Sequence, residues 1–150
     1  MLRKPKSLLP NDVQEQVVRA IRAAEARTTG ELRVFVESRC AYMDAMDRAK
    51  ELFRKLAMEK TVRRNAVLVY LALTDKQFAI FGDEQIYIQA GGPQFWDAAG
   101  RLLLSHFKEG RISDGLCACI DTLGAALEKH FPPDPLVEKN ELPDEIVFGK

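Results

Sequence analysis

Four oxygen-bearing side chains in this chain are of the kinds that bind cations: Glu25, Glu31, Asn65 and Asp83. Carboxylate and amide oxygens without sulfur ligands are the donors that hard cations such as calcium and magnesium prefer. The four residues are far apart in the sequence, and their spacing is not that of an EF-hand loop. Only the fold can bring them together, so the elements that carry them decide whether a cation site exists.

Three segments have the composition of β-strands. Residues 31–37 alternate between apolar and more polar positions, which is the period of a strand. Residues 66–73 are apolar almost throughout, as is typical of a central strand covered on both faces. A turn at residues 74–76 then predicts a hairpin strand over residues 78–81. A predicted helix at about residues 42–59 joins the first two strands, which a right-handed crossover makes parallel.

The directions of these strands predict one acidic edge of the sheet. Parallel strands begin at the same edge, so Glu31 and Asn65 are expected to be neighbours. The hairpin strand runs the other way, and its end returns Asp83 to a place beside Asn65. A helix predicted from residue 11, which ends before residue 28, runs antiparallel to the first strand and brings Glu25 towards the same edge.

Two other interpretations of these residues stay open. Glu31 and Asp83 are also the kind of polar residue that water solvates at strand ends, with Asp83 making a local turn bond. Alternatively, Arg64 is close enough in the sequence to pair with one of the carboxylates.

The remaining segments predict helices on both faces of the sheet. Residues 84–89 favour a short further strand, and residues 93–108 and 113–129 have apolar positions at helical spacing. The tail from about residue 132 is acidic towards its end, and residues 146–148 are expected to add an edge strand that covers the sheet, in preference to docking on a partner. Together these elements predict an α/β fold, a three-layer α/β/α sandwich with a central mixed sheet of about four to five strands.

Length and composition predict one compact domain. The chain has 150 residues and is 47% hydrophobic, which is enough for a core without disulfide bonds. We expect residues 1–10 to be a flexible N-terminus and residues 11–150 to form a single domain that includes the acidic tail.

Charge and cysteine content indicate a cytoplasmic protein that does not bind nucleic acid. Lys plus Arg and Asp plus Glu both number 22, so no net charge favours phosphate backbones. The three cysteines form no CxxC pair and no even disulfide set. The first ten residues contain only a two-residue apolar run, too short for a signal peptide, and no segment has the length of a membrane span. We expect no direct membrane insertion, a monomer, and another protein as the partner.

No sequence motif assigns a catalytic residue. Cys40 is followed six positions later by Met46, not by the arginine that a cysteine-phosphatase loop requires. The chain also lacks a DxD pair, a P-loop and a GxGxxG turn. Catalytic residues therefore remain unknown, and any hydrolysis would depend on a bound metal ion.

Several short motifs, in this order and spacing, resemble the TPM domain family over nearly the whole chain from about residue 11. They are Thr29-Gly30-Glu31, Arg64-Asn65-Ala66-Val67-Leu68, Phe78-Ala79-Ile80-Phe81-Gly82-Asp83, Phe95-Trp96, His130-Phe131-Pro132 and Asn140-Glu141-Leu142-Pro143-Asp144-Glu145. The resemblance implies an α/β/α domain that binds divalent cations. It also implies that acid phosphatase activity is to be considered, because a plant relative in the thylakoid lumen is associated with that activity.

Three hypotheses follow for the function. The first is a non-catalytic domain that binds calcium or magnesium and acts through protein contacts. In it Glu31 and Asp83 ligate the ion, Asn65 supplies an oxygen or orients a ligand, and Glu25 is a further participant. The second is a metal-dependent acid phosphatase that acts on phosphomonoesters at the same edge. The third is a structural adaptor without metal.

Overall fold

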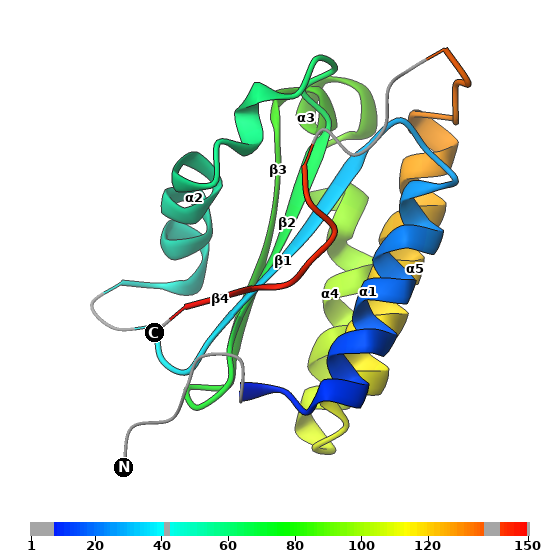
Figure 1. Cartoon of the computed structure of the whole chain (residues 1–150). Coiled ribbons are helices and arrows are strands. Elements are labelled where there is room, and N and C mark those ends of the chain that lie inside the picture. Colours follow the sequence, from blue (N-terminus) through cyan, green and yellow to red (C-terminus); the bar gives the residue numbers. More distant parts are fainter. Residues whose placement is uncertain (1–7, 41–42, 137–141, 150) are drawn as a thin grey trace.

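The computed structural model describes residues 8–40, 43–136 and 142–149 and contains one mixed sheet (Figure 1). The strand order is β3-β2-β1-β4. β1 is parallel to both β2 and β4, whereas β3 is antiparallel to β2. The strands are β1 (Glu31–Glu37), β2 (Ala66–Ala72), β3 (Gln77–Gly82) and β4 (Val147–Phe148).

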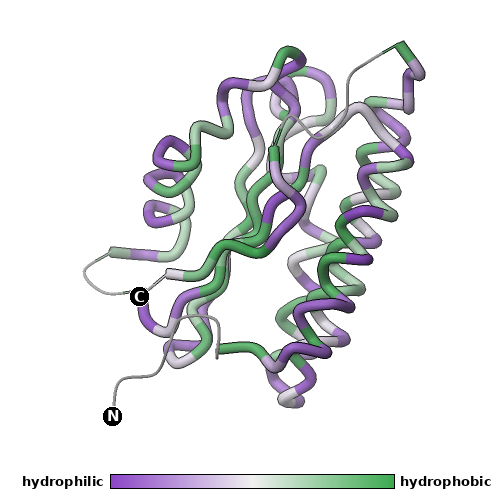
Figure 2. The backbone as a smooth tube through the Cα atoms, in the orientation of Figure 1, coloured by the Kyte–Doolittle hydropathy of each residue, from purple (hydrophilic) through white to green (hydrophobic). Residues whose placement is uncertain are grey.

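Helices cover both faces of this sheet, which confirms the predicted three-layer α/β/α sandwich (Figure 1). One layer contains α1 (Asn11–Glu25), α4 (Pro93–Lys108) and α5 (Ile112–His130), and the opposite layer contains α2 (Ala45–Lys55). β1 and β2 are buried at every position, as strands between two helical layers must be. Figure 2 shows the strands coloured mainly as hydrophobic, while the helices alternate between hydrophobic and hydrophilic colours.

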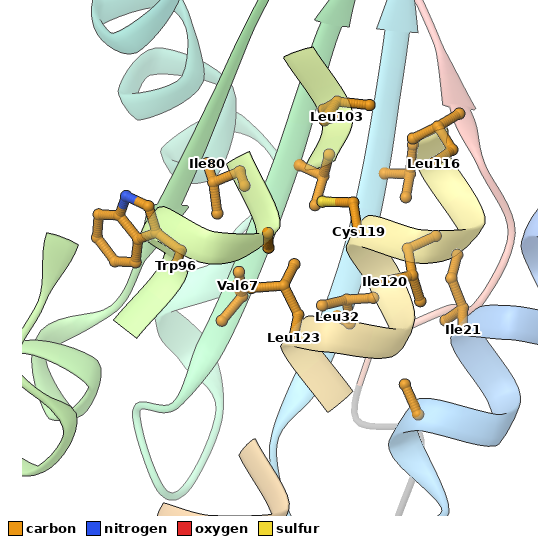
Figure 3. Packing of buried hydrophobic residues seen from close by; sticks show 14 of the residues in the cluster. Ile21, Leu32, Val67, Ile80, Trp96, Leu103, Leu116, Cys119, Ile120 and Leu123 are labelled. Atoms are coloured by element: carbon orange, nitrogen blue, oxygen red, sulfur yellow. The ribbon is translucent and has the colours of Figure 1, made fainter. Parts of the chain in front are cut away.

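Alternation along the strands divides the core into two clusters. Leu32 and Val67 point towards α1, α4 and α5, where they pack with Leu123 and Ile120 of α5 (Figure 3). Tyr70 belongs to the opposite cluster, under α2. Because successive strand residues point to opposite faces, both clusters use the same two strands.

Two of the expected elements differ in the structure. The helix expected at about residues 42–59 is shorter, since α2 ends at Lys55 and Ala57 adopts a left-handed conformation before the 3₁₀ turn η2 (Met58–Lys60). The strand expected over residues 84–89 is wrong, because this segment is the short helix α3 (Glu84–Ala90). The side chain of Asp83 accepts a hydrogen bond from the backbone N–H of Glu84 at 2.7 Å, and this cap favours a helix start.

The C-terminal segment confirms the expected edge strand. Val147 and Phe148 pair with Phe35 and Val36 of β1, so the tail covers the free edge of that strand. The expected flexible N-terminus lies largely outside the described residues, although Leu9 is buried in the core. None of the described helices is long and apolar enough to cross a membrane.

Candidate functional site

Two buried carboxyl groups lie side by side where α1 ends and β1 begins. Glu25 is the last residue of α1 and Glu31 the first residue of β1, and their relative exposures are 3% and 1%. The connection between them is tight: a methyl group on Gly30 would lie 2.9 Å from Leu127 of α5. The connection is thus packed closely against α5, between the end of α1 and the start of β1.

Each of these carboxyl groups accepts one backbone hydrogen bond. Glu25 Oε2 accepts from the N–H of Leu32 at 2.8 Å. Glu31 Oε1 accepts from the N–H of Leu142 in the C-terminal segment at 3.2 Å. Their second oxygens, Glu25 Oε1 and Glu31 Oε2, are buried and receive no hydrogen bond from a donor in the described part of the chain.

Asp144 of the C-terminal segment is a third carboxyl group beside Glu25, and it was not among the predicted ligands. Its side chain is 13% exposed, its Oδ2 lies 3.5 Å from Arg22 Nε, and its Oδ1 is buried without a hydrogen-bond donor among the described residues. In the sequence Asp144 lies in the last of the short motifs, and that position does not predict which residues it contacts in the fold. We call Glu25, Glu31 and Asp144 the carboxyl cluster.

Burial and its carboxyl neighbours change the protonation of Glu25. The pKa of Glu25 is raised to about 10, first by desolvation and then by its hydrogen bonds to Asp144 and Glu31. A neutral Glu25 therefore donates its proton to Asp144 or Glu31, and the carboxyl oxygen that accepts this proton then has a hydrogen-bond donor. Arg33 is also buried, which lowers its pKa, and its Nε has no partner among the described residues. Without a bound ion, this proton and the positive charge of Arg33 reduce the repulsion around Glu25.

Asn65 reaches the predicted edge, beside the start of β1. It immediately precedes Ala66, which pairs with Glu31 in the parallel ladder. Its Nδ2 donates to Thr29 Oγ1 at 3.2 Å, and its buried Oδ1 has no donor among the described residues. An amide oriented in this way presents its oxygen and not its nitrogen to any further ligand.

Asp83 lies outside the carboxyl cluster and is paired with an arginine. Arg64 donates to both of its carboxylate oxygens, from Nε at 2.6 Å and from Nη2 at 2.8 Å. One of these oxygens also caps α3 through Glu84. The structure therefore brings Glu25 and Glu31 together, whereas Asp83 is paired with Arg64, as one of the alternative interpretations expected.

The carboxyl cluster is not a preformed metal centre. Within the described ranges, no group of three or more His, Cys, Asp or Glu side chains is arranged to hold a metal ion. A cation at this place would depend on fewer carboxylates, with amide or carbonyl oxygens and water completing its coordination, as magnesium in particular accepts.

A cleft of about 640 Å³ lies elsewhere, between α3 and the segment after α5. Its lining includes Arg63, Arg64, His130 and Asp134, but neither Glu25 nor Glu31. Arg63 lies 3.4 Å from Asp134, and Arg64 is paired with Asp83. Both arginines of this cleft are thus already paired within the protein.

A second buried polar group lies under α2. Arg48 donates to both oxygens of Glu37, at 2.9 and 3.0 Å, and the hydroxyl of Tyr70 donates to Glu37 Oε2 at 2.5 Å. Burial, followed by the bond to Glu37, raises the pKa of Tyr70 and keeps it protonated. Each oxygen of Glu37 has a donor, so this network joins β1, β2 and α2 through hydrogen bonds made within the protein.

Comparison with known proteins places the chain in one family. The model of the TPM domain matches residues 2–126. The NMR structure of BA42 protein from the psychrophilic bacterium Bizionia argentinensis has 36% sequence identity and a TM-score of 0.84, and the match covers 99% of this chain and 100% of that one. No curated protein matches.

A more distant structure shares the fold alone. The N-terminal domain of cg2496 protein from Corynebacterium glutamicum has 15% identity and a TM-score of 0.66, with 80% of this chain and 74% of that chain covered.

Proposed function

The chain belongs to the TPM domain family, and on that premise we propose that it binds a divalent cation, calcium or magnesium, beside Glu25 and Glu31 and acts through contact with another protein. One observation supports this proposal most. Both carboxyl groups are almost completely buried, and each has an oxygen without a hydrogen-bond donor among the described residues.

The physical argument concerns the cost of burying these carboxyl groups. Two carboxylates removed from water repel each other and lose their hydration, so they need either a proton or a cation between them. The raised pKa of Glu25 corresponds to the first of these, a proton bound to one carboxyl group. A divalent cation that displaces this proton would stabilise the same groups in their charged form.

The donor set suits a hard cation. All candidate ligands are oxygens, and the amide oxygen of Asn65 at the same sheet edge is a further candidate. The described residues contain no three-carboxylate centre. The proposed coordination shell therefore consists of two carboxylates, water and neutral oxygens. Asp83 is left out of this ligand set because Arg64 occupies both of its oxygens.

The phosphatase hypothesis has less support. The cleft that contains Arg63 and Arg64 does not include Glu25 or Glu31 in its lining, so a phosphoryl group in this cleft would not lie beside the proposed ion. The ion would supply positive charge to the chain's own carboxylates, and we propose no reaction at it.

Titration of metal into chelator-treated protein tests the proposal. An ion that binds only the folded state raises the melting temperature, so millimolar calcium or magnesium should raise that of the wild type. The Glu31→Gln variant should lose most of this rise relative to its own metal-free form. The Asp83→Asn variant is the matched control and should keep it.

Two outcomes would contradict the proposal. An unchanged melting temperature of the wild type at millimolar metal would leave the metal-free adaptor as the better hypothesis. A response that is lost in Asp83→Asn and kept in Glu31→Gln would move the site to the Arg64 side of the sheet edge.

A further inference from the structure

The outer edge of β3 is a free strand edge with an apolar groove beside it. No described strand pairs with this edge, because β3 is the terminal strand of the order β3-β2-β1-β4 (Figure 1). We infer that this edge joins two copies of the chain, with their β3 strands paired antiparallel about a two-fold axis into one continuous sheet. Such a dimer differs from the monomer expected from the sequence, and it does not depend on the proposed cation site.

Alternate residues of β3 direct their backbone hydrogen-bonding groups away from β2. The N–H of Asp83, next after the strand, donates to the carbonyl of Ala66 at 2.9 Å. Because inward and outward groups alternate along an antiparallel strand, the N–H and C=O groups of Phe78 and Ile80 face the outer edge. Unpaired backbone groups at a strand edge are a template for pairing with another chain.

The groove beside this edge has a volume of about 360 Å³ and is lined by residues of α2, β3 and α4. Its apolar lining includes Met46 of α2, Phe78 and Ile80 of β3, and Trp96 and Leu104 of α4. Leu104 is 42% exposed in the single chain, although it is a large apolar residue. A strand added to β3 would therefore cover apolar surface as well as backbone groups, and both favour association.

Two charges of opposite sign indicate which occupant fits the groove. Asp97 and Arg101 both line it and lie one turn apart on α4. Both are exposed, and neither has an ion-pair partner in the part of the chain that the structure describes. A peptide of one charge sign would pair with one of these residues and be repelled by the other.

A two-fold axis makes this pair of charges self-complementary. When two β3 strands pair antiparallel, the axis is perpendicular to the sheet, so the two α4 helices lie on the same face and run in opposite directions. Asp97 of one copy then faces Arg101 of the other, and the reverse contact is identical. Gly100 lines the groove between them and has no side chain to hold the helices apart. A second copy of the chain therefore satisfies both charges.

Sedimentation of wild-type protein in chelator tests for the dimer. Between about 1 μM and about 1 mM, the affinity range of modest interfaces, the mass should rise from that of one chain to that of two. Asp97→Arg and Arg101→Asp should each weaken association about tenfold or more, because like charges then face each other across the axis. The double variant should associate as the wild type does, and an equimolar mixture of the two single variants should form a mixed dimer.

Arg19→Asp is the matched control for these charge reversals. Arg19 is 74% exposed, follows an acidic residue by four positions on α1, and does not line the groove. This variant should associate as the wild type does. A wild type that remains a single chain up to about 1 mM would overturn the inference and leave an extended segment of another protein as the better occupant. Equal association of the wild type and both single variants would also overturn it.

Hydrogen exchange locates the contact on β3. The amides of Phe78 and Ile80 should exchange several times more slowly at a concentration where the dimer forms than at one where the single chain prevails. The amide of Ala79, which pairs with Tyr70 of β2, is the internal control and should change less. A dimer in which Phe78 and Ile80 exchange as they do in the single chain would overturn the pairing of the β3 strands.

Discussion

Arg64 donates two hydrogen bonds to Asp83 across the β2–β3 hairpin, at 2.6 and 2.8 Å, and so removes that carboxylate from the acidic edge of the sheet. Asp83 is 5% exposed and also caps α3. The pair therefore orders the start of a helix beside the hairpin. The edge of the sheet is divided between this ion pair and the carboxyl cluster on the other side of β2.

Asp83→Ala should destabilise the protein through the lost helix cap. Removal of a capping side chain costs about 1 kcal/mol, and the free energy of unfolding in urea measures the change. Asp83→Asn keeps an oxygen that can cap and should be milder. Equal losses for the two variants would show that the charge pairing with Arg64 matters and the cap does not.

The stability of the metal-free protein should fall as the pH rises from about 5 to 10. The folded-state pKa of Glu25 is about 10 and its ordinary value is 4.5, so between these values the native state binds the extra proton. Stability then decreases with pH, by at most about 1.4 kcal/mol per unit. Urea unfolding from pH 5 to 9 in chelator should show this slope for the wild type and a smaller slope for Glu25→Gln. Parallel curves would contradict the assignment.

Arg48→Met should be among the more damaging substitutions outside the apolar core. It leaves the carboxylate of Glu37, whose side chain is 6% exposed, with the Tyr70 hydroxyl as its remaining side-chain donor. Breaking a buried pair in this way costs about 3 kcal/mol. Arg54→Met, on the exposed side of the same helix, is the control and should change the free energy of unfolding by less than about 0.5 kcal/mol.

Gly124→Ala should disturb the contact between α1 and α5. A Cβ at this position would lie 2.7 Å from the Cβ of Ala24, the residue directly before Glu25. The helices must separate to relieve this overlap, at a cost of about 1–3 kcal/mol. Ala24→Gly in the same chain should recover part of the loss, and a double-mutant cycle in urea measures the coupling. Independent effects of the two substitutions would contradict this contact.

The predicted fold follows from periodicity in the sequence. The alternation in β1, the continuous apolar run of β2 and the hairpin turn before β3 define a mixed sheet, and the crossover helix makes β1 and β2 parallel. The strand expected over residues 84–89 is wrong, because this segment belongs to helix α3. Its short length leaves periodicity ambiguous, and the side-chain cap at Asp83 decides for a helix.

The sequence by itself determined that Glu31 and Asn65 share an edge of the sheet with the end of the hairpin, because chain direction is set by the order and type of the elements. Only the tertiary structure decided which carboxylates meet. The acidic tail has no periodicity, so nothing in it predicts that Asp144 lies against Glu25 or that Leu142 contacts Glu31. Side-chain pairing depends on distances of a few ångströms, and such distances arise only when the layers pack.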